Sequence, residues 1–205
     1  GKVALVTGSA SGIGSAIAKR FAREGARGME YNAWGQFANG PDHEPTLVYT
    51  RMLSGPMDFT PGILSLRGSG DVKLASTLAK QLGLYLALYS PIQMAADFIE
   101  ELDKYPRELD FISKVPADWE ISKLIAGEVG DFAIFARKDR NSADWYVGGV
   151  NDATPRTIDA KLDFLDAGQE LFPIKGPLRH AIGEGRIGHE LGMAFPFQLM
   201  LPDHR

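Results

Sequence analysis

The strongest constraint on the fold is a change in the spacing of apolar residues near Trp119. Before this point, apolar side chains recur every three or four residues between 72 and 90, which is the period of an amphipathic helix. After it, short β-rich runs at 132–137 and 145–150 flank a polar turn, and a third run covers 157–165. Such runs are typical of antiparallel strands. The chain is therefore predicted to be α/β, with antiparallel strands after the helical part.

Local signals predict further elements. Residues 47–53 are predicted to form a strand. Ser90 and Pro91 are predicted to begin a new helix, as N-cap and first helical residue, with Met94, Ala95 and Phe98 on its apolar side. Two aspartates are predicted to be capping or turn carboxylates, Asp58 and Asp97.

Composition excludes several kinds of partner and site. The 205 residues are enough for one ordinary domain or two small ones. A net charge of −4 without a basic run argues against nucleic acid as a partner. There is no cysteine, so neither a disulfide framework nor a thiolate site is expected. No apolar stretch reaches membrane-spanning length, so no membrane partner is expected.

The first 25 residues have the pattern of a nucleotide-binding unit. An apolar run at 3–7 is predicted to be a buried strand, and 15–24 is predicted to be a helix. Between them, glycines allow the backbone to approach a pyrophosphate, and the helix N-terminus supplies N–H groups. The NAD(P)-binding residues expected there are Gly8, Ser9, Gly12, Ile13 and Gly14. This segment resembles the opening of short-chain dehydrogenases/reductases, which implies a Rossmann-like β-turn-α unit.

The rest of the chain departs from that family. Its catalytic pair is a tyrosine followed four positions later by a lysine, and none of the six tyrosines here has that neighbour. Residues 28–35 also do not form the second strand that would read the ribose. The segment can therefore be a nucleotide site, or a strand-turn-helix unit that binds no nucleotide.

The middle of the chain carries longer motifs in a fixed order. Glu24 and Glu30 stand six residues apart beside an aromatic cluster. The motifs are 24–31 (EGARGMEY), 49–62 (YTRMLSGPMDFTPG), 84–85 (LY), 89–97 (YSPIQMAAD), 115–119 (VPADW) and 136–145 (ARKDRNSADW). Together they closely resemble glycoside hydrolase family 97, the α-glucosidases and α-galactosidases of bacterial polysaccharide use.

This resemblance implies a fold, a site and a location. Residues 26–125 would be the C-terminal part of a (β/α)8 barrel, 126–169 the start of a β-sandwich-like domain, and 170–205 an unassigned tail. Glu30 would be the catalytic acid, and Glu24 and Glu30 would hold calcium, a cation that takes six to eight oxygen ligands. The substrate would be an α-linked oligosaccharide, met in the periplasm or outside the cell.

Several alternatives remain open beside this interpretation. A complete barrel needs about 250 residues, and the earlier strands that carry the family's base and other calcium ligands are not in this sequence. Glu24 and Glu30 can therefore equally be solvated surface carboxylates. Open sheet edges favour association, so a homo-oligomer or a non-catalytic interaction protein is also possible.

The two resemblances meet on residues 21–27, a stretch that suits both families. This overlap leads to the hypothesis that the chain is a chimera. In the tail, His180, Glu184, His189, Glu190, Asp203 and His204 do not have the spacing of a known metal motif, and they are predicted to be polar loop residues.

Overall fold

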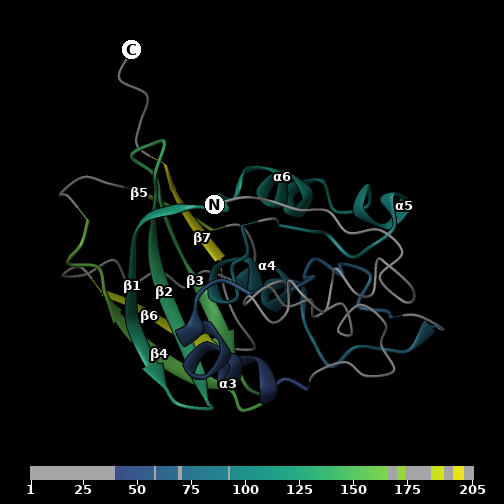
Figure 1. Cartoon of the computed structure of the whole chain (residues 1–205), viewed down its shortest axis with the longest axis horizontal. Coiled ribbons are helices and arrows are strands. Elements are labelled where there is room, and N and C mark those ends of the chain that lie inside the picture. The colour runs from purple at the N-terminus through teal and green to yellow at the C-terminus, as the bar shows by residue number, and fades with distance from the viewer. Residues whose placement is uncertain are drawn as a thin grey trace.

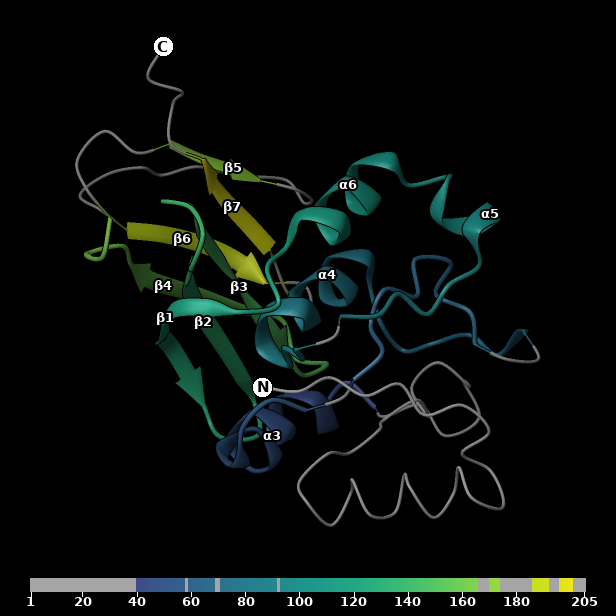
Figure 2. The same cartoon turned by 45° about the horizontal axis from the view of Figure 1, so that its top comes forward.

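The structure is a computed structural model that describes residues 40–57, 59–68, 71–91, 93–165, 170–173, 186–191 and 196–200. Its helices α3 and α4 lie on one face of a five-stranded sheet, and a two-stranded sheet lies on the opposite face (Figures 1 and 2). The helices are α3 (His43–Tyr49), α4 (Leu78–Ala87), α5 (Ile99–Leu102) and α6 (Pro106–Lys114), with a 3-10 turn η1 (Arg51–Ser54). None of the described helices is long and apolar enough to cross a membrane.

The main sheet is antiparallel and has the strand order β1-β2-β3-β7-β5. The second sheet pairs β4 with β6, also antiparallel. The strands are β1 (Trp119–Glu128), β2 (Phe132–Asp139), β3 (Trp145–Asn151), β4 (Arg156–Lys161), β5 (Glu170–Pro173), β6 (Arg186–Leu191) and β7 (Pro196–Met200). The strands predicted at 132–137 and 145–150 are thus confirmed as β2 and β3. The strand predicted at 157–165 is confirmed as β4 only as far as Lys161.

Alternation along the strands sends side chains to two separate cores. Ala133 and Val150 pack against α3 and α4, and Tyr146 packs with α4 and α6. On the opposite face, Ala136, Trp145 and Val147 pack with side chains of β4 and of the turn that follows it. Because both faces are covered, β3 is buried along its whole length.

Helix α4 is a core helix and not a surface helix. The Thr77 hydroxyl accepts a hydrogen bond from the Lys80 backbone N–H at 3.1 Å, which caps the helix N-terminus. Every residue from 80 to 87 is buried, because the sheet covers one side while α6 and the loop around Leu64 cover another. The helix predicted over 72–90 is therefore present, but it is shorter at both ends.

The strand predicted at 47–53 is wrong. These residues fall in α3 and η1. The helical turn places Leu47 and Val48 together in the core beside Met57 and Leu84, an arrangement that a strand would prevent by sending neighbouring side chains to opposite faces. Tertiary burial decides the conformation here.

The helix predicted to begin at Ser90 is also wrong, because described residues 93–98 contain no helix. The backbone of this segment pairs with other segments. Ala96 N–H donates to the Pro61 carbonyl at 3.0 Å, and the Met94 carbonyl accepts from the Tyr85 hydroxyl at 2.8 Å. These long-range bonds replace the bonds that a helix would make internally.

The turn role predicted for Asp97 is confirmed. Its carboxylate accepts from the backbone N–H groups of Ser65 at 2.7 Å and Phe98 at 3.0 Å. Asp58 lies outside the described residues. Between residues 40 and 118, the described residues form helices and loops with one isolated bridge, Arg67 to Lys73. They do not show barrel strands, and the Rossmann-like segment lies outside them.

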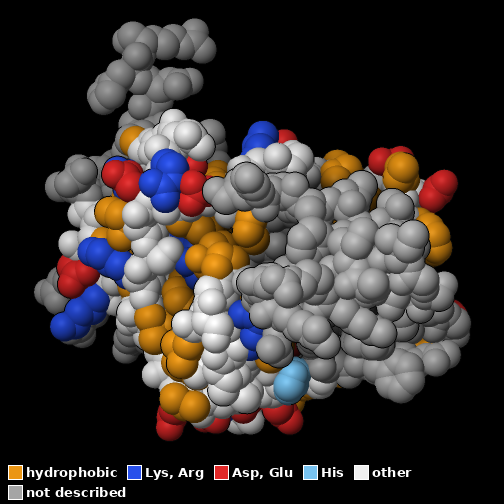
Figure 3. Space-filling view, viewed as in Figure 1, with side chains coloured by type: hydrophobic (Ala, Val, Ile, Leu, Met, Phe, Trp, Pro, Cys, Tyr) orange, Lys and Arg blue, Asp and Glu red, His pale blue; other side chains and the backbone are white. Residues whose placement is uncertain are grey.

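Strand β1, which the sequence patterns did not predict, forms one edge of the main sheet. It is largely exposed along its middle, and Leu124 has an exposed fraction of 49%. On the side of the molecule where β1 lies, apolar and charged side chains share the surface (Figure 3).

Candidate functional site

The residues predicted to carry chemistry lie outside the described part of the chain. This applies to the acid Glu30 and its calcium partner Glu24. It also applies to the predicted nucleotide-binding residues, which are Gly8, Ser9, Gly12, Ile13 and Gly14. Their roles stay predictions, and the described residues define what supports them.

A metal site is not formed within the described ranges, where no three His, Cys, Asp or Glu side chains lie close enough to hold an ion. The loop conformation predicted for the six polar tail residues is wrong for His189 and Glu190, which lie in strand β6. The other four lie outside the described residues.

A buried group with three polar partners in the described part is the Lys80 ammonium, on α4. It lies 2.6 Å from Oε2 of Glu44 on α3. It also donates to the carbonyls of Pro41 and Asn151, each at 3.0 Å. These three acceptors use all three N–H bonds of the ammonium. We call this arrangement the Lys80 clamp, because it joins α3, α4 and the end of β3.

Burial governs the electrostatics of the clamp. Desolvation raises the pKa of the Glu44 carboxyl, and the Lys80 charge and hydrogen bond oppose that rise. Both side chains are buried, so removing either partner would leave the other without compensation. The pair therefore holds α3 against α4, and a substitution that removes only one of the two charges would destabilise the fold.

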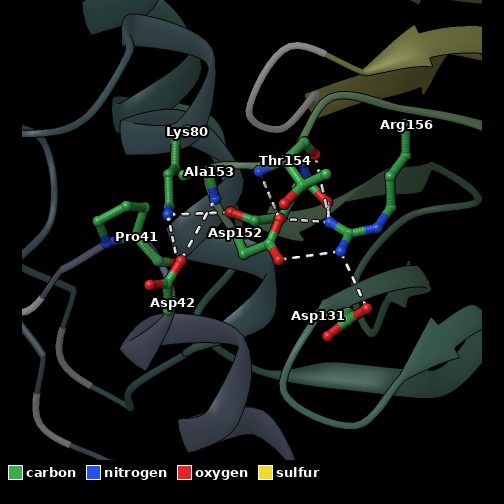
Figure 4. Close-up of polar contacts among 9 residues, drawn as sticks. Pro41, Asp42, Lys80, Asp131, Asp152, Ala153, Thr154 and Arg156 are labelled. Atoms are coloured by element: carbon green, nitrogen blue, oxygen red, sulfur yellow. Dashed lines mark hydrogen bonds and ion pairs between the residues drawn. The ribbon is translucent and has the colours of Figure 1, made fainter.

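A second polar network adjoins the clamp, because Asn151 contacts both Lys80 and Arg156. Figure 4 shows Arg156 between Asp152 and Asp131 in this network. Arg156 donates from Nη1 to the side-chain oxygen of Asn151 at 2.5 Å, and it also binds Asp152 through Nη1 and Nη2. Its Nη2 lies 2.9 Å from Oδ2 of Asp131, in the turn between β1 and β2. The guanidinium therefore ties that turn to the connection between β3 and β4, beside the Lys80 clamp.

A buried amide fixes the loop that precedes α4 in space. The side-chain oxygen of Gln81 accepts from the backbone N–H groups of Gly62 and Ile63 at 3.0 and 3.1 Å. Its amide nitrogen donates to the Ser76 hydroxyl at 2.9 Å. Since Gly62 has a φ of +87°, this loop is held in a conformation that favours glycine.

Arg137 on β2 is the other deeply buried cation. It donates to the Leu86 carbonyl at 2.7 Å and to the Ser122 hydroxyl at 2.6 Å. Its guanidinium carbon lies 4.4 Å from the ring centroid of Phe135 and 4.5 Å from that of Tyr89. Desolvation lowers its pKa to about 10, while Tyr89 acts in the opposite direction, so it remains a cation at neutral pH.

These contacts give the described part a supporting role. Arg137 and Lys80 direct their hydrogen bonds to protein acceptors, and Lys80 has no N–H left for a substrate. No motif pointed to the clamp. The one available signal was a lysine at position 80, within the apolar spacing of 72–90.

Comparison with known proteins assigns the family. The model of the family described as "Glycosyl-hydrolase 97 C-terminal, oligomerisation" matches residues 118–172. A glycoside hydrolase family 97 enzyme from Pseudoalteromonas sp. strain K8, solved as its E480Q variant with panose, superposes with a TM-score of 0.69. It is 40% identical, and the match covers 85% of this chain and 30% of that one. The chain belongs to glycoside hydrolase family 97.

Curated relatives of this family 97 chain are named as α-galactosidases. A retaining α-galactosidase of Bacteroides thetaiotaomicron is 29% identical over 69% of this chain and 22% of its own length. A probable retaining α-galactosidase of Streptomyces bingchenggensis is 32% identical, over 68% and 20% respectively. The family 97 chain thus spans about a fifth of the length of these relatives.

Proposed function

We propose that this chain acts in the hydrolysis of α-linked glucosides or galactosides, as part of a family 97 glycosidase. The observation that carries the proposal is its 40% identity, over 85% of its length, to the Pseudoalteromonas family 97 enzyme solved with panose. The names of the curated relatives support an α-galactoside as one substrate class.

The proposed chemistry uses a carboxylic acid that protonates the leaving glycosidic oxygen. Glycosidases pair such an acid with a second carboxylate, which acts as base or nucleophile. We assign the acid to Glu30, which matches the acid of the family. Glu24 and Glu30 would hold calcium through their oxygens, and the bound cation would offset the charge of neighbouring carboxylates. The second carboxylate would have to come from outside the matched segment.

The described residues supply the support for this site. The Lys80 clamp and the buried Arg137 join the helices to the antiparallel sheet. Strands β1 to β4 lie within residues 118–172, which match the family model described as C-terminal and as serving oligomerisation. We therefore propose a homo-oligomer, assembled through this sheet, as the active form.

The test is hydrolysis of 4-nitrophenyl α-glucoside and α-galactoside by the purified chain. Glu30→Gln should abolish release of nitrophenol, because the amide cannot donate the proton. Glu100→Gln, at an exposed carboxylate on α5, is the matched control and should keep the wild-type rate. Wild-type release no faster than that of a heat-inactivated sample would reject the catalytic proposal.

Calcium and nucleotide binding can be tested by thermal unfolding. A ligand that binds only the folded chain raises its melting midpoint. A rise with calcium that is lost in Glu24→Gln supports the metal assignment. A rise with NADPH that is lost when Gly14 is replaced by valine would support the nucleotide-binding alternative, which the comparisons do not favour.

The chimera hypothesis has its own test at the level of DNA. Residues 21–27 suit both families, so a junction would fall within them. Sequencing across this stretch in the source DNA should show family 97 coding sequence starting there. A continuous upstream sequence encoding the remainder of a barrel would rule the chimera out.

A further inference from the structure

Strand β1 has one unpaired edge in the described structure. It pairs with β2 on one side, and no described strand lies on the other. The unpaired edge of this ten-residue strand presents a row of backbone N–H and C=O groups that can pair with another strand. The second sheet packs against a face of β1 rather than along this edge (Figure 2).

Two charges on β1 have no ion-pair partner among the described residues. These are Lys123 and Glu128, and both are exposed. Nζ of Lys123 lies 5.8 Å from the ring centroid of Phe164. The edge therefore carries one unpaired charge of each sign.

A bulge places both charges on the same face of the sheet. Lys123 lies opposite Ala136, and Glu128 lies opposite Phe132. Ala136 and Phe132 are four residues apart on β2, so their side chains lie on the same face of the sheet. The register shifts by one residue between Leu124 and Ala126. Positions 123 and 128 differ by an odd number, so in a regular strand their side chains would lie on opposite faces. The extra residue of the bulge shifts the alternation by one and brings both side chains to the same face. Both side chains therefore project from the face that carries Ala136 and Ile134, towards the second sheet.

We propose that two copies of this chain join through antiparallel pairing of β1 with β1, with Lys123 of each copy opposite Glu128 of the other. The two-fold symmetry of such a pair makes every contact occur twice. In this register, the interface contains two ion pairs, each between Lys123 of one copy and Glu128 of the other. Opposite charges directly across an antiparallel pair of strands stabilise the pairing.

The same register also covers the exposed apolar residue of the edge. Leu124 lies opposite Gly127 of the other copy, and both belong to the face that carries Ala133 and Phe135. The Tyr49 hydroxyl already fills the space on the side-chain side of Gly127, where a Cβ would lie 2.0 Å from its oxygen. Pairing would cover Leu124, whose exposed fraction is 49% in the single chain. Charge complementarity and the alternation of side chains favour a second copy as the occupant of this edge.

The inference deepens the proposed role of the sheet in assembly, but its readout is independent of catalysis. The experiment is sedimentation velocity of the full chain over a range of concentrations. Lys123→Glu and Glu128→Lys should each raise the dimer dissociation constant about tenfold or more, because two attractive pairs become repulsive. Lys73→Glu and Glu100→Lys make the same charge changes at exposed sites away from the edge and should remain dimeric.

The decisive sample is a mixture of the two single variants. In a mixed pair, the carboxylate introduced at position 123 of one variant would face the ammonium introduced at position 128 of the other. The native Lys123 and the native Glu128 would also face each other, so both contacts are attractive again. A dimer that forms in the mixture but in neither variant alone supports the proposed register. A monomeric wild type, single variants as dimeric as the wild type, or a mixture that stays monomeric would each overturn it. Dimerisation without any glycoside hydrolysis would reject only the catalytic proposal.

Discussion

Lys80 Nζ and Glu44 Oε2 lie 2.6 Å apart on neighbouring helices, with side-chain exposed fractions of 0% and 7%. Because Lys80 also binds the Asn151 carbonyl, the contact links the helices to the sheet. A buried ion pair contributes little net stability compared with an apolar pair, but removing one partner is costly.

Lys80→Met should lower the free energy of unfolding by about 3–5 kcal/mol, because it leaves the Glu44 carboxylate buried without a counter-charge. Urea titration measures this change. Lys114→Met is the matched control, since Lys114 forms an exposed pair with Asp110, and it should cost less than about 1 kcal/mol. Adding Glu44→Leu to Lys80→Met should recover much of the loss. Equal midpoints for the Lys80 and Lys114 variants would contradict this account of the clamp.

Asp152 should make stability fall in acid. The hydrogen bond from Arg156 is the main cause that lowers the pKa of this carboxyl below its ordinary value of 3.8. The unfolded chain therefore takes up the proton first as pH falls. The contribution is present above pH 3.8 and is lost as pH falls through the lower folded pKa.

Urea midpoints measured from pH 6 downwards test this dependence. Asp152→Asn and Arg156→Gln should each reduce the loss of stability in acid, because each removes the interaction that separates the folded and unfolded pKa values. If both variants lose stability in acid as steeply as the wild type, the dependence arises from other groups.

Gly62→Ala should be destabilising. The residue has a φ of +87°, and a Cβ atom there would lie 2.5 Å from the Tyr85 hydroxyl oxygen. That hydroxyl is bonded to the Met94 carbonyl, so it cannot move without breaking a bond. We expect a loss of about 1–3 kcal/mol from crowding and backbone strain.

Gly40→Ala is the control for this substitution, since no atom of the described residues lies within 4 Å of the place that a Cβ would occupy there. It should leave the melting temperature almost unchanged. Thermal unfolding followed by circular dichroism compares the two variants, and a Gly62 variant that melts with the control would refute the steric argument.

Arg137→Lys should cost about 2–4 kcal/mol, since an ammonium cannot bind Leu86 and Ser122 together while stacking on Phe135. Arg140→Lys provides the control, because Arg140 is exposed and pairs with Asp118 at the surface. It should change the urea midpoint little. A wild-type midpoint in the Arg137 variant would mean that the planar guanidinium is not required.

Patterns that depend on neighbouring residues were sufficient to predict β2 and β3. Their runs flank a polar turn, and such a pair closes into a hairpin by local contacts. Conformations decided by distant contacts were not predictable. Helix α3 is stabilised by packing against residues such as Leu84, and the segment after Ser90 is held by Tyr85 and Pro61.

In the candidate functional site, too, some features could be predicted from the sequence, while others depend on contacts between distant residues. Motif resemblance predicted the family from residues 24–31 and 49–62, and the comparisons confirm that assignment. The roles of Glu24 and Glu30 stay predictions. The Lys80 clamp could not be predicted, because it joins positions 44, 80 and 151, and a single sequence gives no signal for contacts over such separations.

Helix α4 covers the face of the sheet that carries Ala133, Tyr146 and Val150. The region matched by the family model begins at 118, after this helix, so its first residue is not the boundary of a unit that packs independently of α4. A recombination junction between positions 87 and 119 would separate α4 from the sheet face against which it packs. We therefore expect helix and sheet to be inherited together, with recombination tolerated only outside the span that joins them.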